Sequence, residues 1–160
     1  MVLDDTAKLW VFWGSGRYYS NLDKTNTEQQ YFYGVKDPVL NAGCTQSTAT
    51  NCQQQDLVDM SSATVCTVCA GNQVSGVAGG TVTSFDGSTT TTLQGLVASK
   101  NGWFTTLPDS AERNLNSPAV LGGIVFFPSY VPTQDICAAT GEGFLYARSE
   151  ERRVGKECRL

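Results

Sequence analysis

Ser117–Ala147 decides the fold, and it reads SPAVLGGIVFFPSYVPTQDICAATGEGFLYA. Its first residues, Ser117–Leu121, form a short apolar strand, and Gly122-Gly123 suits the positive φ angles of a tight hairpin turn. Ile124–Phe127 is a second strand of β-branched and aromatic residues. A proline-rich loop then leads to a glycine turn at Gly141–Gly143 and to a third strand that ends the stretch. The pattern predicts a small antiparallel meander.

The start of the chain repeats this rhythm. Met1–Leu3 is apolar, Asp4-Asp5 suits a turn, Lys8–Trp13 is an aromatic strand, and Gly14–Gly16 supplies the glycines. Two copies of such a unit suggest radial repetition. We therefore predict a mainly β fold, a partial β-propeller with two blade-like units. A blade takes about 40–50 residues, so the 160-residue chain is expected to be a fragment of a larger propeller.

Further strands and one helix are predicted between the two units. Gln30–Lys36 and Trp103–Leu107 are aromatic strands. The segment at about 92–99, Thr92–Ser99, is predicted to be a short helix that Asn101-Gly102 would stop. The competing interpretation is a hairpin that turns at Asp86-Gly87.

Polar segments divide the rest of the chain. Ser20–Glu28 is predicted to be a loop, and residues at about 41–70, rich in Gln, Thr and Asn, an insertion that contains cysteines. Residues 148–160 change abruptly to alternating charges and resemble the translation of a common sequencing adapter; the other interpretation is a solvated charged tail. We therefore expect residues 1–147 to form the natural β domain and 148–160 to be a non-native tail.

Composition excludes several classes of function. The chain has a net charge of −4, and its basic residues are scattered, which argues against a nucleic-acid partner. No run of about 18 apolar residues predicts a membrane span. The lack of histidine rules out Ser-His-Asp and Cys-His catalysis and histidine-ligated metals.

Several motifs, in this order, resemble the C-terminal β-propeller of PilC/PilY-type proteins. Val11–Tyr19 (VFWGSGRYY) is similar to the signature fGTGRY, and Gln29–Asp37 (QQYFYGVKD) to Q-x-(F/Y)-Y-G-(I/V)-x-D, with Asp23 between them. Ser15 and Ala111 depart from the usual Thr and Gly. The residues that match the family pattern and are expected to be structural are Gly14, Gly16, Arg17, Tyr18, Gln30, Tyr33, Gly34, Asp37, Trp103, Glu112, Arg113, Gly141 and Tyr146.

The resemblance implies a role in type IV pilus biogenesis and adhesion. Such proteins lie at the pilus tip or on the outer surface, so an exported protein at the cell surface, pilus tip or outer membrane of a bacterium is implied. The implied partners are type IV pilus components and a host or abiotic surface ligand. The resemblance also implies a calcium-binding Asp-rich loop in the full-length family. No spaced oxygen ligands of that kind can be placed on this chain, so no cofactor is expected in it.

The implied export favours structural disulfides among Cys44, Cys52, Cys66 and Cys69. Cys44–Cys52 with Cys66–Cys69 is the local choice among three pairings, and Cys137 is expected to be unpaired in this chain. A redox pair or a zinc site at the same cysteines is less well supported. The residues around Cys66 are β-branched, and the gap from Cys44 to Cys52 is wide for zinc.

Two interpretations are open for the aromatic residues. They could line a carbohydrate or host-surface site, but alternation at strand spacing favours packing between blades. These residues are Trp10, Phe12, Tyr18, Tyr31, Tyr33, Trp103, Phe126 and Tyr146. Glu112-Arg113 is expected to make a structural ion pair or to position a loop rather than to catalyse a reaction.

The sequence thus predicts a non-enzymatic scaffold that binds through loops on a rigid β framework. One alternative is a fragment of a quinoprotein dehydrogenase, whose blades share the strand–turn–strand rhythm that ends in G-x-L-Y-A. The residues that would stack and hold a quinone are not recognisable here. A generic extracellular β-domain is the third interpretation.

Overall fold

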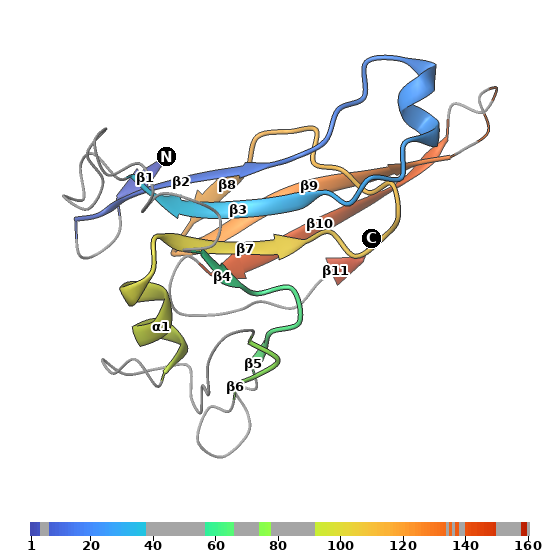
Figure 1. Ribbon diagram of the computed structural model, residues 1–160. Coiled ribbons are helices and arrows are strands. Elements are labelled where there is room, and N and C mark those ends of the chain that lie inside the picture. Colours follow the sequence, from blue (N-terminus) through green and yellow to red (C-terminus); the bar gives the residue numbers. More distant parts are fainter. Residues whose placement is uncertain are drawn as a thin grey trace, which may run out of the picture.

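The computed structural model describes most of both predicted units. It covers residues 1–3, 7–37, 57–65, 74–77, 92–133, 135, 137, 140–149 and 158–159. Two β-sheets lie one over the other, with a short helix below the first sheet (Figure 1). The prediction of a mainly β chain is confirmed, and the two stacked sheets are consistent with a partial β-propeller.

The first sheet contains the N-terminal unit. Its strand order is β1-β2-β3-β7-β4. The first four strands in this order pair antiparallel, and β4 adds to β7 in parallel. The strands are β1 (Val2–Leu3), β2 (Leu9–Gly14), β3 (Tyr31–Lys36), β7 (Gly102–Thr106) and β4 (Leu57–Asp59).

The second sheet contains the unit predicted from Ser117–Ala147. Antiparallel strands follow the order β11-β10-β9-β8. Gly122 and Gly123 turn the chain between β8 and β9 with φ angles of 59° and 73°, as the hairpin requires. The strands are β8 (Ala119–Leu121), β9 (Ile124–Pro132), β10 (Gly141–Ser149) and β11 (Cys158–Arg159).

Two details of this unit were predicted wrongly. The expected proline-rich loop is part of β9, because strand pairing with β10 continues from Ile124 to Pro132. Proline fits since β8 pairs with β9 only as far as Phe126. The backbone N–H of Tyr130 points away from β10, toward the carbonyl of Arg113. Alternate residues of a strand point their N–H groups to the same side, so Pro128 and Pro132 lack an N–H on the side away from β10 and remove no bond to β10. The expected turn at Gly141–Gly143 is instead the paired start of β10.

Aromatic rings join the two sheets into one core. Phe32 of β3 and Phe127 of β9 are fully buried, and their rings stack with centroids 3.6 Å apart. Phe127 also stacks on Tyr146 of β10, while Phe32 contacts Trp103 of β7. Burying such rings between the sheets is the main source of stability in this arrangement.

The predicted helix exists as α1 (Leu93–Ser99), with Thr92 as its N-cap. Gly102 does not stop it, because the helix ends at Lys100 in an extended conformation. Gly102 lies instead in β7 with φ of 146°, where a Cβ would overlap the carbonyl oxygen of Gly34. The competing hairpin at Asp86-Gly87 lies outside the described residues.

Smaller elements complete the described chain. A 3-10 helix, η1 (Asn21–Thr25), lies within the segment predicted as a loop, and β5 (Thr64–Val65) pairs with β6 (Val74–Ser75). Most of the expected insertion and of the expected tail lie outside the described residues. Within the described ranges, no helix has the length and apolar character needed to cross a bilayer.

Candidate functional site

Most of the motif residues converge at one end of the stacked sheets, where the chain leaves β2 and where the connector 111–114 runs toward the second sheet. Gly14 and Gly16 let the connector pass close to the end of β2. A Cβ on Gly14 would overlap Asn114, and a Cβ on Gly16, whose φ is 117°, would overlap the side chain of Arg113. The backbone N–H of Asn114 donates to the carbonyl of Ser15 at 3.1 Å, and this bond joins the connector to the residue that follows β2.

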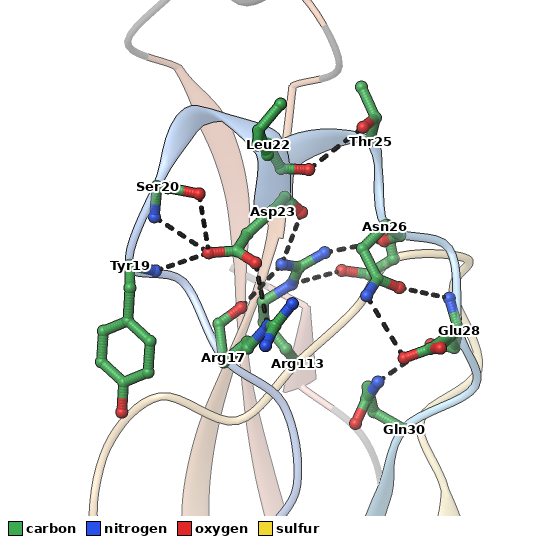
Figure 2. Close-up of polar contacts among 11 residues, drawn as sticks. Arg17, Tyr19, Ser20, Leu22, Asp23, Thr25, Asn26, Glu28, Gln30 and Arg113 are labelled. Atoms are coloured by element: carbon green, nitrogen blue, oxygen red, sulfur yellow. Dashed lines mark hydrogen bonds and ion pairs between the residues drawn. The ribbon is translucent and has the colours of Figure 1, made fainter.

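Arg113 holds the loop that follows Gly16. Its side chain is buried, with 4% exposed. Nη1 donates to the carbonyl oxygens of Arg17 and Asp23, both at 2.8 Å, and Nη2 donates to that of Asn26 at 2.9 Å (Figure 2). Burial lowers the pKa of Arg113 from its ordinary value, and the nearby Asp23 opposes that shift. One buried cation therefore fastens both ends of residues 17–26, which we call the tip loop.

Asp23 organises the tip loop from within. Its carboxylate accepts hydrogen bonds from the backbone N–H groups of Tyr19 (2.8 Å) and Ser20 (2.9 Å) and from Nε of Arg17 (3.0 Å) (Figure 2). The backbone bonds from Tyr19 and Ser20, followed by the charge of Arg17, lower the pKa of Asp23. The ionised carboxylate thus sets the start of η1.

Glu112 points to the second sheet rather than to its neighbour Arg113. Its side chain is 1% exposed, and Oε1 accepts from the hydroxyls of Ser129 and Tyr146 (2.7 Å to Tyr146). Oε2 accepts from the backbone N–H of Asp109 at 3.1 Å. The two adjacent charges therefore hold different parts of the fold: Glu112 ties the connector to β9 and β10, and Arg113 ties it to the tip loop.

A polar pocket of about 410 Å³ opens beneath the tip loop. Arg17 lines it with a side chain that is 69% exposed and held at Nε by Asp23. No hydrogen bond joins the terminal nitrogens of Arg17 to another part of the chain that the structure describes. The lining residues are Gly16, Arg17, Asn26, Glu28, Gln30 and Arg113.

Two large apolar side chains extend from the tip loop into solvent. Tyr19 is 91% exposed and Leu22 80% exposed, and in Figure 2 both point away from the polar network. Lys24, on η1, is buried and donates from Nζ to the carbonyl of Asp135 at 3.2 Å. This bond anchors η1 to the connection between β9 and β10.

Other motif residues support this end of the molecule. Tyr18 lies with its ring 5.9 Å from the Arg113 guanidinium, a cation–π contact. Gln30 accepts from the hydroxyl of Ser15 at 2.8 Å. Gly141 lets the ring of Tyr130 pass over β10, because a Cβ there would overlap that ring.

Other motif residues lie in or beside the first sheet. Gly34 faces Trp103 and Phe12, which a Cβ would overlap. Asp37 follows β3, and its backbone N–H donates to the carbonyl of Leu9 at 2.7 Å. These positions shape the sheet rather than the pocket.

The aromatic residues divide between the two faces of the first sheet. Trp10, Phe12, Trp103 and, from β10, Tyr146 are buried in the core between the sheets. Tyr31 and Tyr33 lie on the opposite face with Trp13 and Phe104, where Trp13 stacks on Tyr33 at 5.2 Å. Packing between sheets therefore accounts for the first group, and the second forms an outer aromatic cluster.

No metal or disulfide site can be assigned within the described residues. No three acidic or cysteine side chains among them gather closely enough to hold a metal ion. Cys44, Cys52, Cys66 and Cys69 lie outside the described residues, so their predicted pairing stays a prediction. Cys137 is exposed and is not bonded to another cysteine in the described chain.

Sequence reasoning missed several residues of the site. Asn114 donates from Nδ2 to the carbonyl of Pro128 at 2.6 Å, and Lys24 and Ser129 are buried polar partners. The sequence places Asp23 only within the family pattern and assigns it no contact. The spacing Ser20-x-x-Asp23 at the start of η1 is the local signal that could have assigned its role.

The fold and site define a mainly β chain with a loop held at one end of two stacked sheets. It is similar to a protein described as type IV pilus biogenesis factor PilY1 homolog, from Xylella fastidiosa strain Temecula1. The two are 28% identical over 145 residues, which covers 85% of this chain and 8% of that protein. The similarity supports a distant relation to PilY1-type proteins. No family model and no solved structure matches the chain.

Proposed function

We propose that this chain is part of a type IV pilus biogenesis and adhesion protein, in which it acts as a non-enzymatic binding scaffold. The observation that supports this most is the similarity to the PilY1 homologue over 85% of the chain. The chain spans less than a tenth of that protein, so the activity and partners of the whole are part of the proposal.

The site supports a binding role rather than a catalytic one. The two charged side chains of the connector bind groups within the fold. Arg113 donates to backbone carbonyls of the tip loop, and Glu112 accepts from buried hydroxyls on β9 and β10. These contacts rigidify the scaffold. A rigid β framework that presents a loop at one end is a common arrangement for binding. The proposed location is the surface of the bacterium, with pilus components as partners.

Deletion of the gene for the full-length protein tests the proposal. We expect surface pilin, measured after shearing, to fall while the total cellular pilin is unchanged, and wild-type complementation to restore it. Normal surface pili and normal adhesion in the deletion strain would overturn the proposal. Quinone-dependent dye reduction by the intact protein is expected to be undetectable, and robust turnover would favour the dehydrogenase alternative.

A further inference from the structure

The tip loop exposes apolar and charged side chains of the kinds that protein interfaces use, and most of their surface makes no contact within the fold. Tyr19 and Leu22 project from it with 91% and 80% of their surface exposed. Single exposed apolar residues are common, but here two project from one loop of ten residues, next to the pocket that Arg17 lines. Aromatic residues and arginine are the side chains that contribute most to binding energy at interfaces.

The loop is organised before any partner arrives. Arg113 binds the carbonyls of Arg17, Asp23 and Asn26, and Asp23 binds the backbone of Tyr19 and Ser20. Lys24 anchors η1 to the carbonyl of Asp135. Because these bonds already restrict the backbone, binding of a partner would not carry the entropic cost of ordering the loop.

The charges beside the loop indicate what the partner carries. Asp23 holds Nε of Arg17 (Figure 2), and the two terminal nitrogens of this pocket-lining residue make no hydrogen bond within the part of the chain that the structure describes. Guanidinium edges of this kind bind carboxylates with two parallel hydrogen bonds. The carboxylate of Glu28 also lines the pocket, where Asn26 Nδ2 donates to it at 3.2 Å. The negative charge of Glu28 disfavours a ligand with more than one negative charge, such as a phosphate.

We propose that the tip loop docks a partner polypeptide that places one carboxylate against Arg17 and packs apolar side chains against the exposed Tyr19 and Leu22. The apolar contact distinguishes a polypeptide from an acidic polysaccharide, which has carboxylates but few groups that would bury Leu22. The inference rests on the proposed function only for the statement that the partner is a pilus component.

Peptide selection on the full-length protein tests the docking surface. A random peptide library is selected on the wild-type protein and counter-selected on the Arg17→Gln and Leu22→Ser variants. We expect the enriched peptides to carry Asp or Glu next to an apolar residue. Arg17→Gln should weaken their binding about tenfold in fluorescence anisotropy, and changing the peptide's Asp to Asn should remove most of that difference.

The controls separate the docking surface from folding and from net charge. Leu22→Ser removes no charge, should also weaken binding several-fold and should keep the wild-type melting temperature. Arg17→Gln loses one exposed contact to Asp23 and should lower the melting temperature only slightly. Lys100→Gln, which removes an exposed cation after α1, should leave affinity unchanged. Failure to enrich peptides, or peptides that bind wild type and both variants equally, would overturn the inference. Binding of alginate that depends on Arg17, without acidic peptides, would overturn it too.

This experiment does not depend on pili, so the two proposals can fail separately. Normal piliation in the deletion strain would overturn the proposed function and leave the peptide result intact. A negative peptide selection with lost piliation would overturn only the docking surface.

Discussion

Gly16 and Arg113 meet at the point where the connector between the sheets crosses the end of β2. Arg113 lies against Gly16 so closely that any Cβ there would overlap its side chain. Gly16 also has φ of 117°, which residues with a Cβ rarely adopt. The glycine therefore serves two purposes, backbone conformation and close approach, and the buried guanidinium depends on both.

Alanine at Gly16 should destabilise the fold more than alanine at Gly122, a turn glycine that also has positive φ. Gly122, with φ of 59°, lies in the left-handed region, where alanine costs about 1–2 kcal/mol of unfolding free energy, whereas Gly16, with φ of 117°, lies outside that region and is less favourable still for a residue with a Cβ. Gly122 has open space around it, whereas Gly16→Ala adds an overlap that costs about 1–3 kcal/mol more. Urea unfolding of the two variants measures the difference. Equal losses would contradict the close approach.

Asp23 makes the stability of the loop depend on acid pH. The pKa of Asp23 is lowered in the folded chain, so its ionised form stabilises the fold at every pH above the ordinary value of about 3.9. This stabilisation is lost as the pH falls below that value and through the lowered folded-state pKa. The difference in unfolding free energy between wild type and Asp23→Asn should be constant near neutral pH and shrink below about pH 4. A difference that is independent of pH would contradict the assignment.

Residue by residue, the sequence could identify the members of this site but not their contacts. The motif positions Gly14, Gly16, Arg17 and Arg113 converge as one cluster, although the first three lie far from Arg113 in the chain. The roles of Lys24 and Asn114 could not be predicted, because their partners are backbone carbonyls of segments distant in sequence. No local pattern records such a contact.

At the scale of elements, α1 shows how a short helix persists with a glycine inside it. The helix has seven residues, and Gly95 weakens it by about 1 kcal/mol relative to alanine. Lys36 of β3 compensates at the C-terminal end, where Nζ donates to the carbonyls of Val97 (2.7 Å), Ala98 (3.0 Å) and Lys100 (2.8 Å). A cation at this end also complements the helix dipole.

Replacing Lys36 with methionine should therefore loosen α1. The carbonyls of Ala98 and Lys100 would lose the Lys36 donor and that of Val97 would keep the N–H of Lys100, at a cost of about 1–3 kcal/mol. Amide hydrogen exchange in Leu93–Ser99 should accelerate more than exchange in β9. Lys100→Met removes an exposed cation nearby and should change stability by less than about 0.5 kcal/mol. Unchanged exchange in Lys36→Met would contradict this role.

Element types could be predicted from sequence better than element ends. The strands around Phe32 and Val125 and the helix at Leu93 follow from local patterns of apolar residues. The ends of β9 and the place of Gly102 could not, since they depend on which edge of a strand is paired. Pro128 is compatible with β9 only because no β8 residue pairs beyond Phe126, a fact of tertiary structure.

At the scale of the whole molecule, one aromatic core holds two sheets, and the outer face of the first sheet is also apolar. Phe32 and Phe127 stack at the centre, and the outer face of the first sheet carries the cluster with Trp13 and Tyr33. Strands with apolar residues on both faces are typical of sheets that are covered on both sides. Stacked sheets of a propeller have this property, in keeping with the partial propeller predicted from sequence.

The stacked pair Phe32 and Phe127 should dominate the association of the sheets. Phe32→Ala or Phe127→Ala should each cost about 3–5 kcal/mol of unfolding free energy. The double variant should cost less than the sum by about 0.5–1.5 kcal/mol, because the rings contact each other. Phe104→Ala, on the outer face, should cost less than either. Additive losses in denaturant unfolding would contradict direct stacking between the sheets.

The proposal that this chain serves type IV pilus biogenesis by presenting its tip loop to a partner can be tested in the bacterium. The most direct measurement is the amount of surface pilin in a strain whose chromosomal gene carries Arg17→Gln and Leu22→Ser. Export and the amount of the variant protein must match wild type. We predict that surface pilin falls toward the level of the deletion strain, while Lys100→Gln keeps the wild-type level. Wild-type piliation in the tip-loop strain would contradict the claim.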